Sequence, residues 1–120
     1  MPMIEFHYNL EKISETQAPQ LCVPLEEALR SALRRIRPDR GDDYGVFIEG
    51  SPFDVSRNHA DLNIYVFYHP SWEFTENELP LLPEGMSYSL IPTLRALGIR
   101  VSVRIRFYRR DGYAGTSFSV

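Results

Sequence analysis

Pro2 is the residue whose type and position most directly suggest chemistry, because it follows the initiator methionine and opens a strand-like run over residues 2–10. Methionine is usually removed when proline follows it, which leaves a free secondary amine at the start of the chain. A free α-amino group has a pKa of about 7.7 to 8.0. Burial against apolar walls or nearby guanidinium groups lowers that pKa toward the optimum of a general base at neutral pH. Pro2 is therefore the first candidate for a catalytic base.

Arginines near the end of the chain form a second candidate group, although the whole chain carries a formal net charge of -3. They are Arg95, Arg100, Arg104, Arg106, Arg109 and Arg110. Arg104 and Arg106 are two residues apart, so on a strand they point to the same side and can hold one anionic ligand between them. This concentration of cations predicts a local anion site. A solvated or subunit-bridging strand face explains the same arginines, since charged side chains mostly stay in water, and the anion site requires Pro2 beside it.

Length and composition predict one domain over residues 1–120, a common size for a compact domain. Cys22 is the single cysteine, which excludes an internal disulfide and makes a reducing, cytoplasmic compartment the default. The sequence has neither a long apolar run nor a basic segment followed by a hydrophobic one, so we expect no membrane span and no signal peptide. We also expect no metal and no cofactor, because the cluster Asp54, Arg57, His59 and Asp61 matches no metal-site template.

Hydrophobic periodicity predicts six elements that must position these residues. They are a strand over 3–10, an amphipathic helix from Pro24 to Ile36, a strand over 44–49, a central strand over 62–68, a helix over 84–97 and a strand over 99–108. This order predicts an α/β fold of two β-α-β units, in which two helices cover one face of a mixed sheet.

The alternation of side chains assigns the two faces of the predicted sheet. The apolar set expected under the helices is Ile4, Phe6, Tyr8, Val101, Val103 and Ile105. The other set is Glu5, His7, Ser102, Arg104 and Arg106. A mixed face of this kind is typical of subunit contact or ligand binding.

The whole chain resembles the tautomerase superfamily, in particular its macrophage migration inhibitory factor branch. The features that carry the resemblance are the opening Met1-Pro2-Met3, the helix ending near Ile36, the strand from Tyr44 and the closing Asp111-Gly112-Tyr113-Ala114-Gly115-Thr116-Ser117-Phe118. The resemblance implies a homotrimer without a cofactor, in which the amino-terminal proline moves protons between carbon and oxygen of small keto or enol carboxylates. Some members of that superfamily instead dehalogenate or decarboxylate small acids.

The resemblance also assigns roles residue by residue. Pro2 corresponds to the catalytic proline, and Arg40, with Arg37 as the fallback, corresponds to a basic residue that binds the substrate carboxylate. Ser102 and Arg104 replace an aromatic and amide pair, so both identities differ from the family pattern. Arg106 shares the side of Arg104 and is predicted to bind the same carboxylate.

Two other function classes stay open at this point. A non-catalytic, trimeric interaction module of the same fold fits the sequence if Met1 is retained, because the Pro2 nitrogen is then an amide without basicity. The second class is RNA or single-stranded DNA binding by the arginine-rich strand, against which the acidic net charge and the lack of common RNA-binding motifs argue. Trp72 is predicted to form either a lid, a protein contact or the closed edge of the domain.

Overall fold

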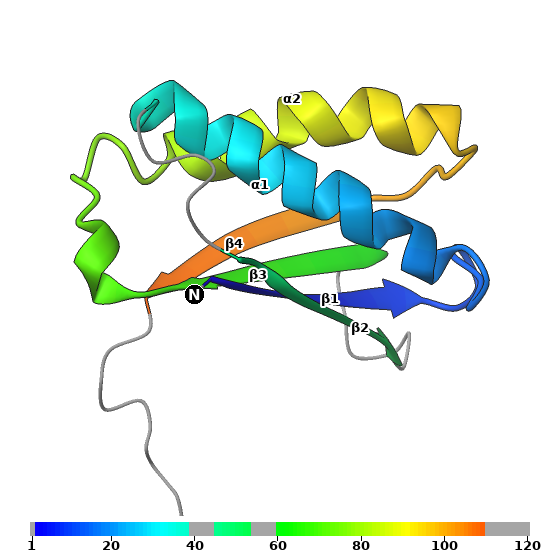
Figure 1. Cartoon of the computed structure of the whole chain (residues 1–120). Helices are drawn as coiled ribbons and strands as arrows, with labels where there is room; N and C mark the ends of the chain where they lie inside the picture. The colour runs from blue at the N-terminus through cyan, green and yellow to red at the C-terminus, as the bar shows by residue number, and fades with distance from the viewer. Residues whose placement is uncertain (1, 39–44, 54–59, 110–120) are drawn as a thin grey trace, which may run out of the picture.

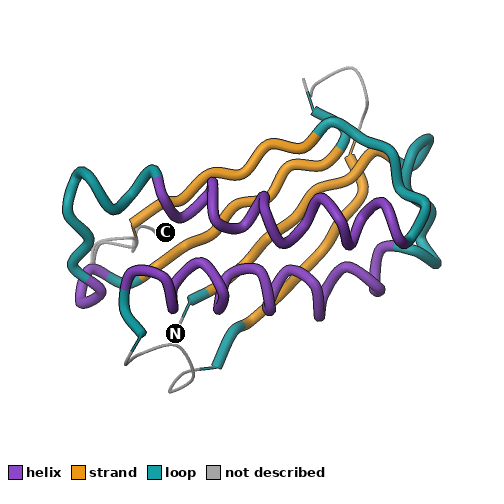
Figure 2. The backbone as a smooth tube through the Cα atoms, turned by 90° about the horizontal axis from the view of Figure 1, so that it is seen from above, coloured by secondary structure: helices purple, strands orange, loops and turns teal. Residues whose placement is uncertain are grey.

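The computed structural model describes residues 2–38, 45–53 and 60–109. Four strands form one sheet in the order β2-β1-β3-β4, and two long helices lie along one of its faces (Figure 1). The elements in chain order are β1 (Met3–Asn9), η1 (Ala18–Leu21), α1 (Cys22–Ile36), β2 (Phe47–Phe53), β3 (Leu62–Tyr68), η3 (Pro70–Trp72), α2 (Leu81–Ala96) and β4 (Val103–Arg109). Seen from above, α1 and α2 run side by side across the sheet (Figure 2).

The sheet is mixed, as predicted. β1 is parallel to β2 and antiparallel to β3, and β3 is parallel to β4. Each parallel pair is joined through a helix that returns the chain to the same end of the sheet, which confirms two β-α-β units. The strand over residues 62–68 is confirmed both in its bounds and in its central position.

α1 begins at Cys22, two residues before the predicted start. Pro24 occupies the first turn, where its missing N–H leaves no helical hydrogen bond unmade. Ser14 and Gln17 form the reciprocal hydrogen bonds of a capping box, each of 3.1 Å, but the turn they cap leads into η1 and not into one long helix. The buried side of α1 then follows the helical period predicted from the sequence.

β2 runs through residues 50–52, where we expected it to end, and starts only at Phe47. It is an edge strand that pairs with β1 alone, so the missing N–H of Pro52 interrupts no second ladder. Gly50 is required beside β1, because a Cβ there would lie 2.2 Å from the Phe6 ring. Tyr44, the predicted start of this strand, lies outside the described residues.

α2 and β4 also differ from their predicted bounds. α2 starts at Leu81, one turn before the predicted start, and Gly98 with φ of 74° follows shortly after its end. β4 starts at Val103 and continues to Arg109, so the predicted strand over 99–108 is shifted toward the C-terminus. The described part of the chain contains no helix of the length and apolarity needed to cross a membrane.

The core lies between the helices and the helix-facing side of the two inner strands. Ile4, Phe6 and Tyr8 are buried there, as predicted, whereas Val103 is 38% exposed because β4 is an edge strand that the helices cover incompletely. The register sets Glu49, Glu5, Tyr65 and Arg106 in one row across the opposite face, and Ser51, His7, Asn63 and Arg104 in the next row. Glu5, His7 and the two arginines therefore share one face, as predicted. Ser102 precedes β4 and is not part of these rows.

Candidate functional site

Pro2 lies at the start of β1 and is buried. Its carbonyl accepts a hydrogen bond of 3.1 Å from the Phe47 backbone N–H, which fixes the proline against the first residue of β2. Met3 is paired with Phe67, so continuing the antiparallel register by one residue brings Pro2 opposite Tyr68. Pro2 and Tyr68 have the same parity as Ile4 and Val66, which places both on the helix-facing side of the sheet. Met1 lies outside the described residues.

Aromatic rings gather at this end of the sheet, which we call the Pro2 end. Tyr68 is buried and its ring stacks on Trp72 with centroids 6.4 Å apart, while Phe74 meets Tyr68 edge-on at 5.4 Å and Trp72 edge-on at 5.9 Å. We call Tyr68, Trp72 and Phe74 the aromatic wall. Trp72 and Phe74 are half-buried and pack against the core. Of the three interpretations of Trp72, its contacts with Tyr68, Phe74 and the core favour the one in which it closes an edge of the domain.

Arg104 and Arg106 lie away from Pro2 within one chain. Arg106 is paired with Tyr65 and Arg104 with Asn63, both on the face that the helices leave open. Two strand spacings and three residues separate Arg106 from Pro2, a distance of about 14 Å between backbones. The structure therefore does not bring the two arginines to the proline of their own chain. The Tyr108 hydroxyl raises the pKa of the Arg106 guanidinium, so this side chain is charged at every relevant pH.

Ser102 lies at the opposite end of the sheet, which we call the Asp61 end. The Asp61 Oδ2 atom accepts hydrogen bonds from the Ser102 backbone N–H at 3.1 Å and from its hydroxyl at 3.3 Å, and the hydroxyl accepts one from the Asp61 backbone N–H at 3.0 Å. Asn9 donates a further hydrogen bond of 3.3 Å to Asp61 Oδ1. The Ser102 backbone N–H is the largest cause that holds the pKa of the Asp61 carboxyl below its ordinary value, against an opposing effect of burial. This end lies about 23 Å along β1 from Pro2.

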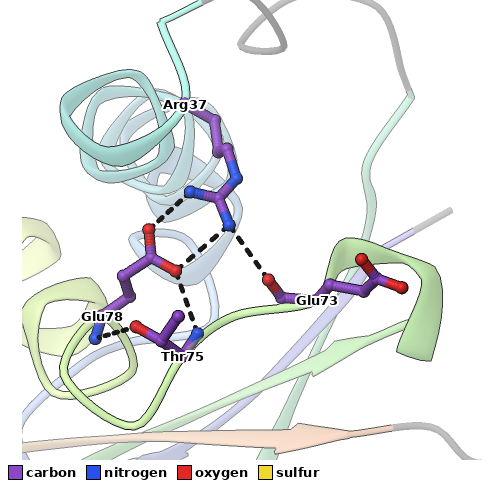
Figure 3. Close-up of polar contacts among 4 residues, drawn as sticks. All are labelled: Arg37, Glu73, Thr75 and Glu78. Carbon is purple, nitrogen blue, oxygen red and sulfur yellow. Dashed lines mark hydrogen bonds and ion pairs between the residues drawn. The ribbon is translucent and has the colours of Figure 1, made fainter.

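Arg40 lies outside the described residues, and Arg37, its fallback, is engaged by another side chain. The Arg37 guanidinium forms a two-pronged ion pair with Glu78 and also donates a hydrogen bond of 3.0 Å to the Glu73 carbonyl (Figure 3). Its side chain is 30% exposed. This arrangement holds Arg37 against the segment between β3 and α2.

Arg109 belongs to the candidate group of arginines near the end of the chain, but it was not one of the residues predicted to bind the substrate. It pairs with Tyr68, and the register places it in the row of Pro2, two strand spacings or about 10 Å away. The alternation of β4 gives it the parity of Ile105 and Phe107, on the helix-facing side. The sequence did not predict this position, because the predicted strand ended at Tyr108 and the side of Arg109 was therefore undefined. Within the described residues, no group of three or more His, Cys, Asp or Glu side chains could hold a metal ion.

Neither protein-family models nor curated proteins match this sequence. Solved structures do match. FG41 malonate semialdehyde decarboxylase inhibited by 3-bromopropiolate is 15% identical, with 98% of this chain and 89% of that chain covered and a TM-score of 0.59. A member of the cis-3-chloroacrylic acid dehalogenase family is 12% identical, with 98% and 81% covered and a TM-score of 0.54. Leishmania major MIF2 is 13% identical, with 91% and 88% covered and the same TM-score.

The chain has the fold of the tautomerase superfamily. This agrees with the resemblance seen in the sequence and with the two β-α-β units. At 15% identity or less, these likenesses concern the fold, and the reaction has to be argued from the residues at the Pro2 end.

Proposed function

We propose that this protein is a tautomerase-like enzyme in which Pro2, once freed from Met1, acts as general base on a small keto or enol carboxylate. The observation that carries the proposal is the buried proline directly before β1, next to the strand end where the aromatic wall lies, in a fold that matched enzymes share. A buried amine is partly desolvated, which favours its neutral, basic form.

In the proposed reaction, the Pro2 nitrogen accepts the hydroxyl proton of the enol as the carbon–oxygen double bond forms, and the protonated nitrogen then delivers that proton to the neighbouring carbon, which restores the neutral amine. The reverse reaction removes the carbon proton and returns one to oxygen. A guanidinium group that binds the substrate carboxylate orients the molecule and stabilises negative charge on the enolate oxygen. No cofactor is needed for this balance of atoms and electrons.

We propose that the guanidinium groups come from Arg104 and Arg106 on β4 of a second copy of the chain. Arg104 and Arg106 lie too far from Pro2 of their own chain, and their open sheet face needs a cover. A homotrimer in a reducing, cytoplasmic compartment would supply both the cover and the cations. Arg40 and Ser102 remain predicted substrate contacts, and Arg109 is the competing candidate within one chain.

The test begins with the intact mass of the protein, which should be lower than that of the full sequence by one methionine. The processed protein should then ketonise phenylenolpyruvate or 2-hydroxymuconate faster than buffer. Pro2→Ala should lower kcat/KM about 100-fold, the lower range for loss of general-base catalysis. Tyr88→Phe, on the outer surface of α2, is the control and should keep wild-type kinetics. Equal rates for Pro2→Ala and wild type would overturn the proposal.

A non-catalytic trimeric module of the same fold is the second candidate. It is favoured by Arg37 and Ser102, whose polar groups are both engaged within the chain. Native mass spectrometry that shows a trimer, together with an uncleaved Met1 and no turnover, would establish this second candidate.

A further inference from the structure

The segment between β3 and α2 carries two members of the aromatic wall and an unusual backbone. Glu73 lies between Trp72 and Phe74 and has φ of 38°, the only positive φ of a non-glycine residue in the described ranges. Such a conformation is unfavourable for a residue with a side chain and persists only where surrounding contacts impose it. The turn at Glu73 allows two residues so close in sequence to meet edge-on, with their ring planes at 83°.

Arg37 supplies contacts that impose this turn. One of its nitrogens donates both to the Glu73 carbonyl, at 3.0 Å, and to Glu78 Oε1, at 3.1 Å, while the other nitrogen donates to Glu78 Oε2 (Figure 3). The guanidinium carbon also lies 5.9 Å from the centre of the Phe74 ring. A single side chain at the end of α1 therefore contacts the turn, the wall and the residues that lead into α2.

Glu78 is also held by Thr75. Its Oε1 atom accepts a hydrogen bond of 2.9 Å from the Thr75 backbone N–H, and its own backbone N–H donates to the Thr75 hydroxyl at 3.2 Å. Arg37, followed by the Thr75 N–H, holds the pKa of the Glu78 carboxyl below its ordinary value. The carboxylate is thus charged and oriented for the fork of the guanidinium.

The position of this pair relative to Pro2 follows from the fold. α1 ends, β3 ends and α2 begins at the end of the sheet where β1 starts (Figure 1). Tyr68, opposite Pro2, carries the stacked Trp72 and the edge-on Phe74. Any loosening of the 73–78 segment therefore moves the aromatic surface nearest to the proposed base.

We propose that Arg37, locked by Glu78, is a positioning residue that holds the aromatic wall in place beside Pro2 and does not bind the substrate carboxylate itself. The catalytic part of this inference rests on the proposed function. The wall excludes water from one side of the base and presents flat apolar surface to a conjugated substrate. Arg37 acts on turnover only through this wall.

The anchoring can be measured without any turnover, because Trp72 is the single tryptophan of the chain. Arg37→Met keeps an aliphatic stem and removes the guanidinium, so Trp72 emission should shift to longer wavelength and acrylamide should quench it more strongly. Arg35→Met is the matched control, since Arg35 is on the same helix and lies over Tyr88 at 5.4 Å, away from Trp72. That control should leave the Trp72 signal unchanged.

Three further variants separate positioning from a general loss of folding. Glu78→Gln should reproduce the Arg37→Met signal, and the exchange Arg37→Glu with Glu78→Arg should restore part of the wild-type signal. Arg37→Lys should give an intermediate signal, because a lysine cannot form the fork. Circular dichroism and thermal melting on the same samples show that each variant is folded.

The kinetic arm uses the same proteins. Arg37→Met and Glu78→Gln should each lower kcat/KM at least about tenfold, the scale expected when a neighbouring surface is displaced. An unchanged Trp72 signal in Arg37→Met overturns the anchoring, whatever the rates are. A changed Trp72 signal with wild-type kcat/KM overturns the positioning role, as does a loss of kcat/KM in Arg37→Met but not in Glu78→Gln, which indicates direct substrate contact. A wild type without Pro2-dependent turnover overturns the proposed function and the catalytic part of this inference, while the fluorescence still decides the anchoring.

Discussion

The Pro2 end and the Asp61 end are built differently, although the same strands run between them. At the Asp61 end, the side chains of Asn9 and Ser102 and the Ser102 backbone N–H donate three hydrogen bonds to one carboxylate, and Asn9 there is 4% exposed. At the Pro2 end, half-buried rings, a residue with positive φ and a charged anchor replace that closed network. Strain is usually retained where function requires it. This difference indicates that the Asp61 end stabilises the sheet, whereas the Pro2 end leaves part of its aromatic surface exposed.

The largest effect is expected on enzyme activity, in an experiment that mixes two inactive variants and measures how much activity returns. Pro2→Ala chains and chains that carry Arg104→Ala and Arg106→Ala together should each be nearly inactive. If one copy supplies the proline and the next supplies the cations, refolding equal amounts together should restore about a quarter of wild-type activity, as random assembly of trimers predicts. Activity is measured as enol ketonisation, and each variant refolded alone is the control. No recovery, with loss of activity in Arg109→Ala, would assign the cation to the same chain.

The next effect is on the free energy of unfolding and is expected from a change in the middle of the sheet, between the two ends. Gly50→Ala should lower the free energy of unfolding by about 1–3 kcal/mol, because the buried Phe6 ring must move to make room for the new Cβ. Urea denaturation measures the loss. Trp72 emission of the folded variant should stay that of the wild type, since the aromatic wall is separate from Gly50. A stability within 0.3 kcal/mol of wild type, a margin of about the scatter of such measurements, would show that the ring yields easily.

The smallest effect tests the polar network of the Asp61 end. Asp61→Asn should reduce the free energy of unfolding at neutral pH by about 1 kcal/mol, the size of a charge-assisted hydrogen bond discounted for partial exposure. The pKa of Asp61 is lowered in the folded state, so this contribution is present above the unfolded pKa, about 3.9, and is lost as pH falls through the lower folded value. Urea denaturation of both proteins between pH 7 and the acid limit should show the gap closing. A gap that persists in acid would contradict the assigned cause.

The hydrophobic pattern of a single segment was sufficient to predict an element and its buried side where that element has only one buried side. The alternation around Ile4, Phe6 and Tyr8 predicted their burial, and the apolar, β-branched run over 62–68 predicted a central strand with correct bounds. Pattern failed at β2, because nothing local shows that Pro52 lies on an edge where its missing N–H is harmless. It failed at the start of α1 for a related reason, since a proline in a first turn resembles a helix start.

The candidate site was less accessible to prediction. Pro2 was identified from its place in the sequence, and its burial agrees with the proposed role. Ser102 and Arg37 were selected through the resemblance to the tautomerase superfamily, but each is hydrogen-bonded to a residue 41 positions away in the chain, Ser102 to Asp61 and Arg37 to Glu78. Arg109 was listed among the candidate arginines, but its place at the end of β4 was not predicted, because periodicity does not fix a strand end to one residue. Strand order and register decide which residues distant in sequence become neighbours, and a short segment of sequence predicts neither of them.

The sequence by itself determined the two β-α-β units, the place of the proline directly before the first strand and the shared side of Arg104 and Arg106, because periodicity reports which face of an element meets water. Only the tertiary structure decided that these arginines lie away from the proline of their own chain. It also decided that Ser102 is hydrogen-bonded to Asp61 and that Arg37 contacts the turn at Glu73. These depend on which strands are neighbours and on contacts between distant segments, which form when the core packs and not when each element does.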